Sequence, residues 1–110
     1  MQPETRFKIK VLKDLSSMDV FAIKIQQVST HGDPDIILCV KGNYVALELK
    51  TLTGRASALQ IYKLDQIKRN GGYSFIVDPN SWPSIRHFIS ELDETKAKEI
   101  PTCLKLPSVI

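Results

Sequence analysis

The segment Tyr44-Val45-Ala46-Leu47-Glu48-Leu49-Lys50 decides the fold. Every second position from Val45 to Leu49 is apolar, a period of two that is typical of a half-buried β-strand. Glu48 and Lys50 fall between the apolar positions. The two charged side chains therefore share the opposite face of the predicted strand.

A second apolar run, Ile36-Ile37-Leu38-Cys39-Val40, precedes this strand, and the turn-forming residues Lys41-Gly42-Asn43 separate the two. We predict a β-hairpin with Gly42-Asn43 as its two-residue loop. An even-length loop places the apolar residues of both strands on one face. An odd-length loop would place them on opposite faces, so burial favours the even register.

Three charged residues meet at the open end of this hairpin. In the predicted register Asp35 lies opposite Lys50, and directly opposite side chains point the same way. Asp35, Glu48 and Lys50 therefore share one face. Carboxylate oxygens beside a lysine suit a hard divalent cation such as Mg²⁺ or Mn²⁺. The alternative is an ordinary surface Glu-Lys pair, and the added Pro34-Asp35 on the same face favours the metal site.

Length and composition indicate one small globular domain, residues 1–110. The chain has 110 residues, of which 43% are hydrophobic and 25% charged, which excludes disorder throughout. A domain of this size buries only about 60–70% of its unfolded surface, so a dimer interface would add useful stability. The net charge of +3 permits nucleic-acid binding without by itself arguing for it.

Cysteine content and hydropathy indicate a cytoplasmic setting. Cys39 and Cys103 are too few and too far apart for a disulfide framework or a zinc site, and Cys39 is expected to be a small buried thiol. No apolar run approaches the roughly 18 residues that span a membrane, and residues 1–6 lack the apolar core of a secretory signal.

The remaining periodicities predict an α/β fold, with the order helix, three strands, helix, strand, helix around a mixed sheet. Its expected elements outside the hairpin are a helix from Pro3 to about Leu15, a strand over Phe21–Gln26, a helix capped by Ser57 and ended by Gly71-Gly72, a strand over Tyr73–Val77, and a final helix capped by Ser81. Residues 93–110 receive no structural assignment.

Two polar residues at helix starts have competing interpretations. Glu4 lies on the apolar stripe of the first helix, so it either reaches the acidic pair or is a first-turn acid stabilised by the helix dipole. Gln60 completes the capping box of Ser57-Ala58-Leu59-Gln60, yet it also lies on the helix face that points toward the sheet. Its two roles are compatible.

Scattered basic residues are candidates for phosphate contacts. Lys10 lies on the outer face of the first helix, Lys24 lies in the first strand and is a candidate for the face of the acidic cluster, Arg55 lies in the loop after Lys50, and Lys63 lies on the second helix. The simpler interpretation of each is a solvated surface charge. His31 is expected to be a loop residue.

The order of these motifs resembles a nuclease family. Pro34-Asp35 followed by Glu48-Leu49-Lys50 looks like the PD-(D/E)xK motif. The longer pattern, which adds Gly32-Asp33, Ser57-x-x-Gln60 and Gly71-Gly72, is similar to the VRR-NUC branch, found as small stand-alone phage and bacterial proteins and within larger repair enzymes. The match covers about residues 4–78, with an extra C-terminal helix and tail over 79–110.

The resemblance implies a PD-(D/E)xK restriction-endonuclease-like core and a site at the matching positions. Asp35, Glu48 and the Leu49 carbonyl would be metal ligands, Lys50 would position or activate the water, Gln60 would be an accessory residue, and an N-terminal-helix glutamate favours a site role for Glu4. The implied activity is Mg²⁺- or Mn²⁺-dependent hydrolysis of DNA, by a homodimer acting on branched DNA such as a four-way junction. Two alternatives remain: a nucleic-acid-binding or assembly module that keeps the fold without turnover, and a small metal-binding protein unrelated to nucleic acid.

Overall fold

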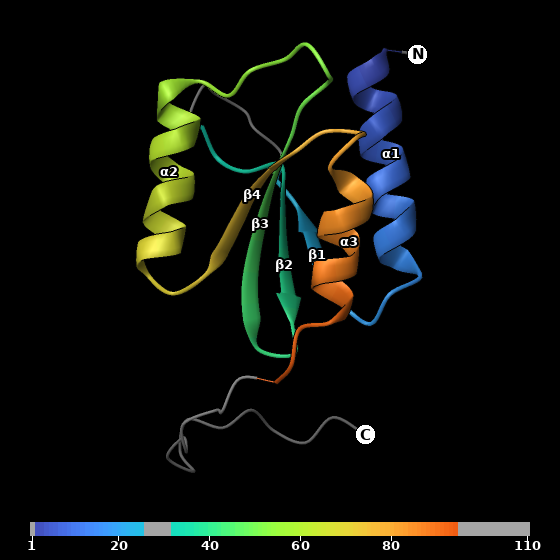
Figure 1. Cartoon of the computed structure of the whole chain (residues 1–110), viewed down its shortest axis with the longest axis vertical. Coiled ribbons are helices and arrows are strands. Elements are labelled where there is room, and N and C mark those ends of the chain that lie inside the picture. The colour runs from blue at the N-terminus through green and yellow to red at the C-terminus, as the bar shows by residue number, and fades with distance from the viewer. Residues whose placement is uncertain (1, 26–31, 95–110) are drawn as a thin grey trace.

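A computed structural model describes residues 2–25 and 32–94 (Figure 1). His31, Gln26 and most of the C-terminal segment lie outside the described residues. The elements in chain order are α1 (Pro3–Ser16), β1 (Phe21–Lys24), β2 (Ile36–Val40), β3 (Asn43–Leu49), α2 (Ala58–Arg69), β4 (Tyr73–Val77) and α3 (Trp82–Ser90). None of the helices in the described part of the chain is both long enough and apolar enough to cross a bilayer.

The four strands form one mixed sheet in the order β1-β2-β3-β4. β1 pairs with β2 and β2 with β3 in antiparallel fashion, whereas β3 and β4 run parallel. The parallel pair requires a crossover, which α2 supplies. The predicted α/β class with a mixed sheet is therefore confirmed.

The hairpin turn lies one residue earlier than predicted. Val40 pairs with Asn43, so the two-residue loop is Lys41-Gly42. Both loop residues have positive φ, 51° and 86° respectively, as a type I′ turn requires. The Asn43 side chain is buried and donates to the Val40 carbonyl at 3.0 Å, which stabilises the residue in the strand. The loop keeps its even length, so the predicted apolar face survives the shift.

Helices cover the two faces of the sheet unequally. Figure 1 shows α1 and α3 on one side and α2 on the other. The main core lies under α1 and α3, and its fully buried members include Val11, Leu15, Ile36, Leu38, Val45, Leu47, Val77 and Ile89. On the opposite face α2 packs against β4 and β3. Cys39, on that second face of β2, is consequently exposed and not a buried thiol as expected.

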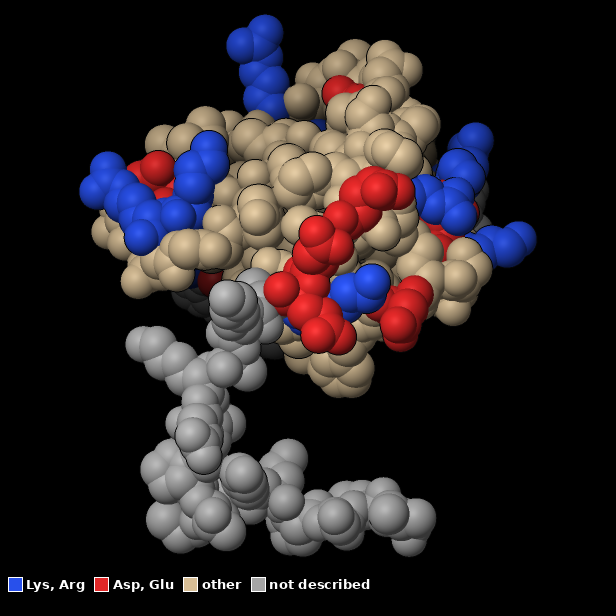
Figure 2. Space-filling view, turned by 60° about the horizontal axis from the view of Figure 1, so that its bottom comes forward, with Lys and Arg blue, Asp and Glu red and all other residues tan. Residues whose placement is uncertain are grey.

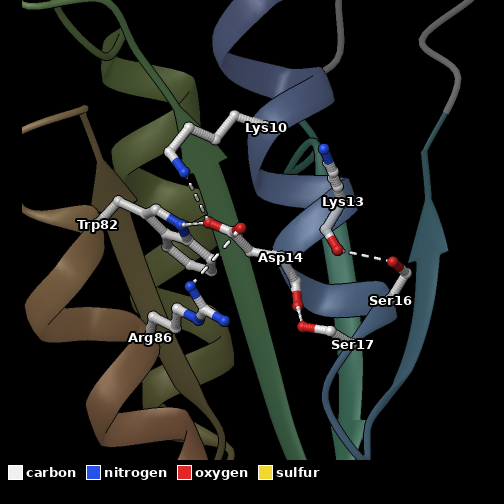
Figure 3. A network of polar contacts seen from close by, with 7 residues as sticks. All are labelled: Lys10, Lys13, Asp14, Ser16, Ser17, Trp82 and Arg86. Atoms are coloured by element: carbon white, nitrogen blue, oxygen red, sulfur yellow. Dashed lines mark hydrogen bonds and ion pairs between the residues drawn. The ribbon is translucent and has the colours of Figure 1, made fainter.

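A polar network ties α1 to α3 (Figure 3). Asp14 accepts a hydrogen bond from the indole N–H of the buried Trp82 at 2.8 Å. Lys10 lies 3.3 Å and Arg86 3.6 Å from the same carboxylate. The bond from Trp82, helped by the two cations, lowers the pKa of Asp14 below its usual value. Asp14 thus joins the two helices that cover the main core.

The caps predicted for both ends of α2 are present, whereas the cap predicted for the start of α3 is not. At the end of α2, the Gly71 N–H donates to the Lys68 carbonyl and the Gly72 N–H donates to the Ile67 carbonyl. These are the paired bonds of a Schellman motif, and Gly71 has the positive φ, 91°, that this motif needs. Ser81, however, makes no side-chain cap for α3. Instead the Asp78 carboxylate accepts the N–H of Ser81 at 2.8 Å, so the turn before α3 is built on Asp78.

Candidate functional site

Asp35 and Glu48 are neighbours at the open end of the hairpin, where the Asp35 carboxylate is close enough to Glu48 to raise its pKa. The strand pairing ends at Ile36 and Leu47, and the Asp35 N–H donates to the Leu47 carbonyl at 3.0 Å just beyond it. Asp35 Oδ2 also accepts the main-chain N–H of Leu49 at 2.7 Å, which orients the carboxyl group toward β3. The sequence predicted Lys50 opposite Asp35. Because the loop begins at Lys41, the register moves by two residues, so the carboxylates of Asp35 and Glu48 come closer together than predicted.

The Glu48 carboxylate is buried, yet only one of its two oxygens has a hydrogen-bond partner among the described residues. Its exposed fraction is 2%, because α2 packs over this end of β3. Oε2 accepts a hydrogen bond from Gln60 Nε2 at 3.0 Å and lies 3.3 Å from the ammonium of Lys50. Oε1 has no hydrogen-bond partner in the part of the chain that the structure describes. A buried carboxylate oxygen without a partner is costly, so it marks a position where a ligand would be stabilising.

The ionisation of Glu48 is strongly perturbed. Burial and, after it, the nearby negative charge of Asp35 raise its pKa from 4.5 to about 7, although Lys50 acts in the opposite direction. Near neutral pH the carboxyl group is therefore poised between its two forms. A cation bound next to Oε1 would offset the burial and the repulsion and would favour the ionised form.

The donor set fits a hard divalent cation that keeps part of its water shell. Within residues 2–25 and 32–94 no group of three or more His, Cys, Asp or Glu side chains converges. Asp35 and Glu48 are two, and Mg²⁺ is commonly held by one or two carboxylates, with waters and substrate phosphates filling the other positions. The predicted contribution of the Leu49 carbonyl stays a prediction.

Gln60 occupies both of the roles that its sequence position allowed. The capping box is complete: the Ser57 hydroxyl accepts the Gln60 N–H at 3.1 Å, and Gln60 Oε1 accepts the Ser57 N–H at 2.8 Å. Since Oε1 is held by a donor, Nε2 is the end of the amide that faces Glu48. The cap of α2 thereby orients a hydrogen-bond donor into the site.

The loop before Asp35 packs against the first turns of α2. Gly32 has φ of 65°, and a Cβ there would lie 2.8 Å from Leu59 Cγ and 3.1 Å from the Gln60 nitrogen. Lys63 reaches Asp33 at 2.8 Å. Lys63 was predicted to contact phosphate, but its amine is engaged with the loop that carries Asp35. The sequence did not predict this contact, because no local pattern relates Asp33 to a lysine thirty positions later.

Arg55 follows a turn that folds back over Lys50. The Gly54 N–H donates to the Thr51 carbonyl at 3.1 Å, and a Cβ on Gly54 would lie 3.6 Å from Lys50 Cδ. The Arg55 side chain is exposed. It is therefore accessible to solvent, and its contact with a phosphate stays a prediction.

Three other predicted residues are not brought to this site. Lys24 pairs with Ile36, whose side chain belongs to the core under α1 and α3, so the expectation that Lys24 shares the face of the acidic pair is wrong. Glu4 and Lys10 are exposed on α1, which covers that same opposite face. Lys10 pairs with Asp14. A phosphate contact by Lys24 and a role for Glu4 stay predictions, whereas the pairing of Lys10 with Asp14 on the opposite face argues against a phosphate contact by Lys10.

Acidic side chains cluster near the hairpin turn, at the end of the molecule away from Asp35 and Glu48. Figure 2 views this end and shows Asp and Glu side chains clustered on it. Exposed acids there are Asp19, between α1 and β1, and Glu91, Asp93 and Glu94, which follow α3. The Asp93 carbonyl accepts from Asn43, which fixes this segment beside the turn. The negative end therefore lies away from Asp35 and Glu48.

Comparison with known proteins does not assign the chain to a family. No protein-family model matches the chain, and neither curated protein sequences nor solved structures give a match.

Proposed function

We propose that this protein is a divalent-cation-dependent nuclease that hydrolyses DNA phosphodiester bonds, with a core of the PD-(D/E)xK type. The observation that carries the proposal is the buried Oε1 of Glu48, which has no hydrogen-bond partner among the described residues and belongs to a carboxylate beside Asp35 and Lys50. A carboxylate with no function in this position would only destabilise the fold. A carboxylate that binds a cation during function accounts for both its burial and its free oxygen.

Asp35 and Glu48 are the residues that would hold the cation. When bound, Mg²⁺ would polarise a phosphate oxygen and lower the pKa of a coordinated water. The Lys50 ammonium, 20% exposed and held against Glu48, is available to donate to a phosphate oxygen as negative charge develops. Gln60 keeps Glu48 Oε2 occupied, which leaves Oε1 as the free ligand atom.

DNA as substrate and a branched structure as its preferred form are supported by the motif order that resembles the VRR-NUC branch. The same resemblance supports a homodimer, whose two sites would nick paired strands of a four-way junction. A reducing, cytoplasmic setting suits the exposed free thiol of Cys39.

Cleavage of labelled DNA tests this function. Linear, flap and four-way-junction substrates are incubated with the protein in EDTA, Mg²⁺ or Mn²⁺. We expect cleavage only with a cation, abolished by Glu48→Gln, with DNA binding retained. Lys50→Ala is expected to retain manganese binding, measured by calorimetry, and to slow single-turnover cleavage about a hundredfold or more, the scale of one lost electrostatic stabiliser.

Glu91→Gln is the matched control, because it makes the same chemical change at an exposed carboxyl group far from the site. It is expected to cleave at the parent rate. Full activity of Glu48→Gln would exclude the assigned site. DNA binding by the parent without cleavage under any cation would instead support the non-catalytic binding module.

A further inference from the structure

A cavity of about 350 Å³ lies between the last turns of α2 and the start of β3. Its walls are the Tyr44 ring, Ile67, the close-packed backbone of Gly72, and the side chains of Gln66 and Asn70. Tyr44 is 45% exposed, so its ring is accessible as well as packed. A Cβ on Gly72 would lie 3.2 Å from the Tyr44 ring, which shows how closely the ring is seated.

This cavity opens on the same sheet face as the acidic pair. Tyr44 and Glu48 are four residues apart on β3 and point the same way, so the ring lies about 13 Å along the strand from the carboxylate. That span corresponds to about four nucleotide steps at the ~3.4 Å rise of a stacked strand. Phe21, 65% exposed on β1, flanks Cys39 on the same rung and extends the open apolar surface beside Tyr44.

The lining combines an aromatic face with amide groups. Asn70 Nδ2 donates to the Gln66 carbonyl at 2.8 Å, which leaves its Oδ1 as an acceptor. The Gln66 side-chain amide has no hydrogen bond among the described residues and offers both a donor and an acceptor. A planar ring with hydrogen-bonding edges matches this set, since bases stack on aromatic side chains and are read at their edges by polar groups.

We propose that the cavity binds an unpaired nucleobase of the strand whose phosphate lies at the acidic pair. The proposal rests on the proposed nuclease function and defines its substrate class as DNA with single-stranded nucleotides about four steps from the cut. A base inside a duplex has its faces covered by its neighbours and does not reach Tyr44. Exposed Lys68, in the last turn of α2 before Asn70, supplies positive charge for the accompanying phosphates, whereas its neighbour Arg69 is paired with Asp65 at 2.7 Å.

Binding without cleavage tests the site separately from the chemistry. The probe is a flap DNA with 2-aminopurine in its single strand, titrated with the protein in EDTA, and a blunt duplex is the reference. Tyr44→Leu keeps an apolar side chain but removes the ring, and is expected to weaken flap binding tenfold or more, as for loss of one base stack. Tyr44→Phe is the control and should bind like the parent. Duplex affinity should not change in either variant.

Gln66→Ala provides a second variant that does not disturb the packed ring. It is expected to weaken flap binding about fivefold, as for one lost hydrogen bond, and to alter the preference among the four bases. Flap affinity equal to that of the parent in both Tyr44→Leu and Gln66→Ala would overturn the proposal. So would sedimentation showing that Tyr44→Leu converts a parent dimer to a monomer, because the face would then be occupied by a second copy. Failure of cleavage alone would leave these binding results standing and would count only against the nuclease function.

Discussion

Glu48 is a residue whose proposed function requires a burial that destabilises the fold. It fills a place under α2 where an apolar side chain would pack without cost, and it carries one oxygen that nothing in the described structure satisfies. Its raised pKa expresses this conflict, since burial and the Asp35 charge both disfavour the ionised form. Sites that bind cations commonly store such local instability in the metal-free protein.

The perturbed carboxyl group predicts an unusual pH dependence of stability. Because the folded-state pKa of about 7 exceeds the usual 4.5, the folded protein retains a proton that the unfolded chain releases between these two values. The contribution of Glu48 to stability therefore falls as pH rises through this window, by at most about 3 kcal/mol. Glu48→Gln should remove this loss and be more stable than the parent at pH 8 in EDTA.

Urea denaturation at pH 5 and pH 8 measures the effect. The two proteins should differ less at pH 5, and Mg²⁺ should stabilise the parent at pH 8 without stabilising Glu48→Gln. A variant that is less stable than the parent at pH 8 would show that Glu48 is a structural anion and not a strained ligand.

At the scale of elements, the helices on the two sides of the sheet stabilise the molecule in different ways. α2 places Gln60 against Glu48 and Lys63 against the loop of Asp33, so it acts as a support for the site. α1 and α3 share the main core and are joined through Asp14 and Trp82 (Figure 3). The first arrangement serves the site, whereas the second stabilises the fold beneath it.

The Asp14–Trp82 bond is expected to be the strongest polar link between α1 and α3. A hydrogen bond from a buried donor to a charged acceptor contributes about 1.5–3 kcal/mol, whereas the partly exposed Asp14–Arg86 pair contributes under about 1 kcal/mol. Double-mutant cycles of Asp14→Ala with Trp82→Phe and with Arg86→Ala separate the two couplings in urea denaturation. Equal couplings in both cycles would contradict this ranking. Since the pKa of Asp14 is lowered in the fold, its contribution should be lost as acidic pH protonates it.

For the whole molecule, the distribution of charge indicates which surface approaches DNA. The net charge of +3 is small, but exposed acids lie at the hairpin-turn end, where α1 and α3 finish (Figure 2). The acidic pair lies at the other end, beside the loop that carries Arg55. We therefore expect DNA to bind at the open end of the hairpin and along the α2 side of the sheet.

This orientation predicts unequal effects for two lysine or arginine substitutions. Arg55→Ala should weaken DNA binding and reduce the slope of log affinity against log salt by about one, the share of one phosphate contact. Lys10→Ala, on the opposite face and paired with Asp14, should change neither. Fluorescence anisotropy over a series of salt concentrations measures both slopes. If Lys10→Ala lost as much DNA affinity as Arg55→Ala, the expected placement of DNA on the α2 side of the sheet would be wrong.

The sequence by itself determined the features that depend on local spacing. Alternation from Val45 to Leu49 defines the buried face, Ser57 and Gln60 build the cap of α2, and Gly71 ends that helix, because each pattern is satisfied within a few residues. Asp35 and Glu48 were also identified as neighbours, since any even register brings them to one face.

Only the tertiary structure decided the features that depend on what packs against what. The choice of Lys41-Gly42 as the loop shifts the register by two residues, so Lys50 does not lie opposite Asp35 as predicted. The position of α2 over β3 and β4 buries Glu48 and leaves Cys39 exposed. These outcomes arise from contacts between segments far apart in the chain, and the free energy of burying one face against a particular helix is not encoded in any local pattern.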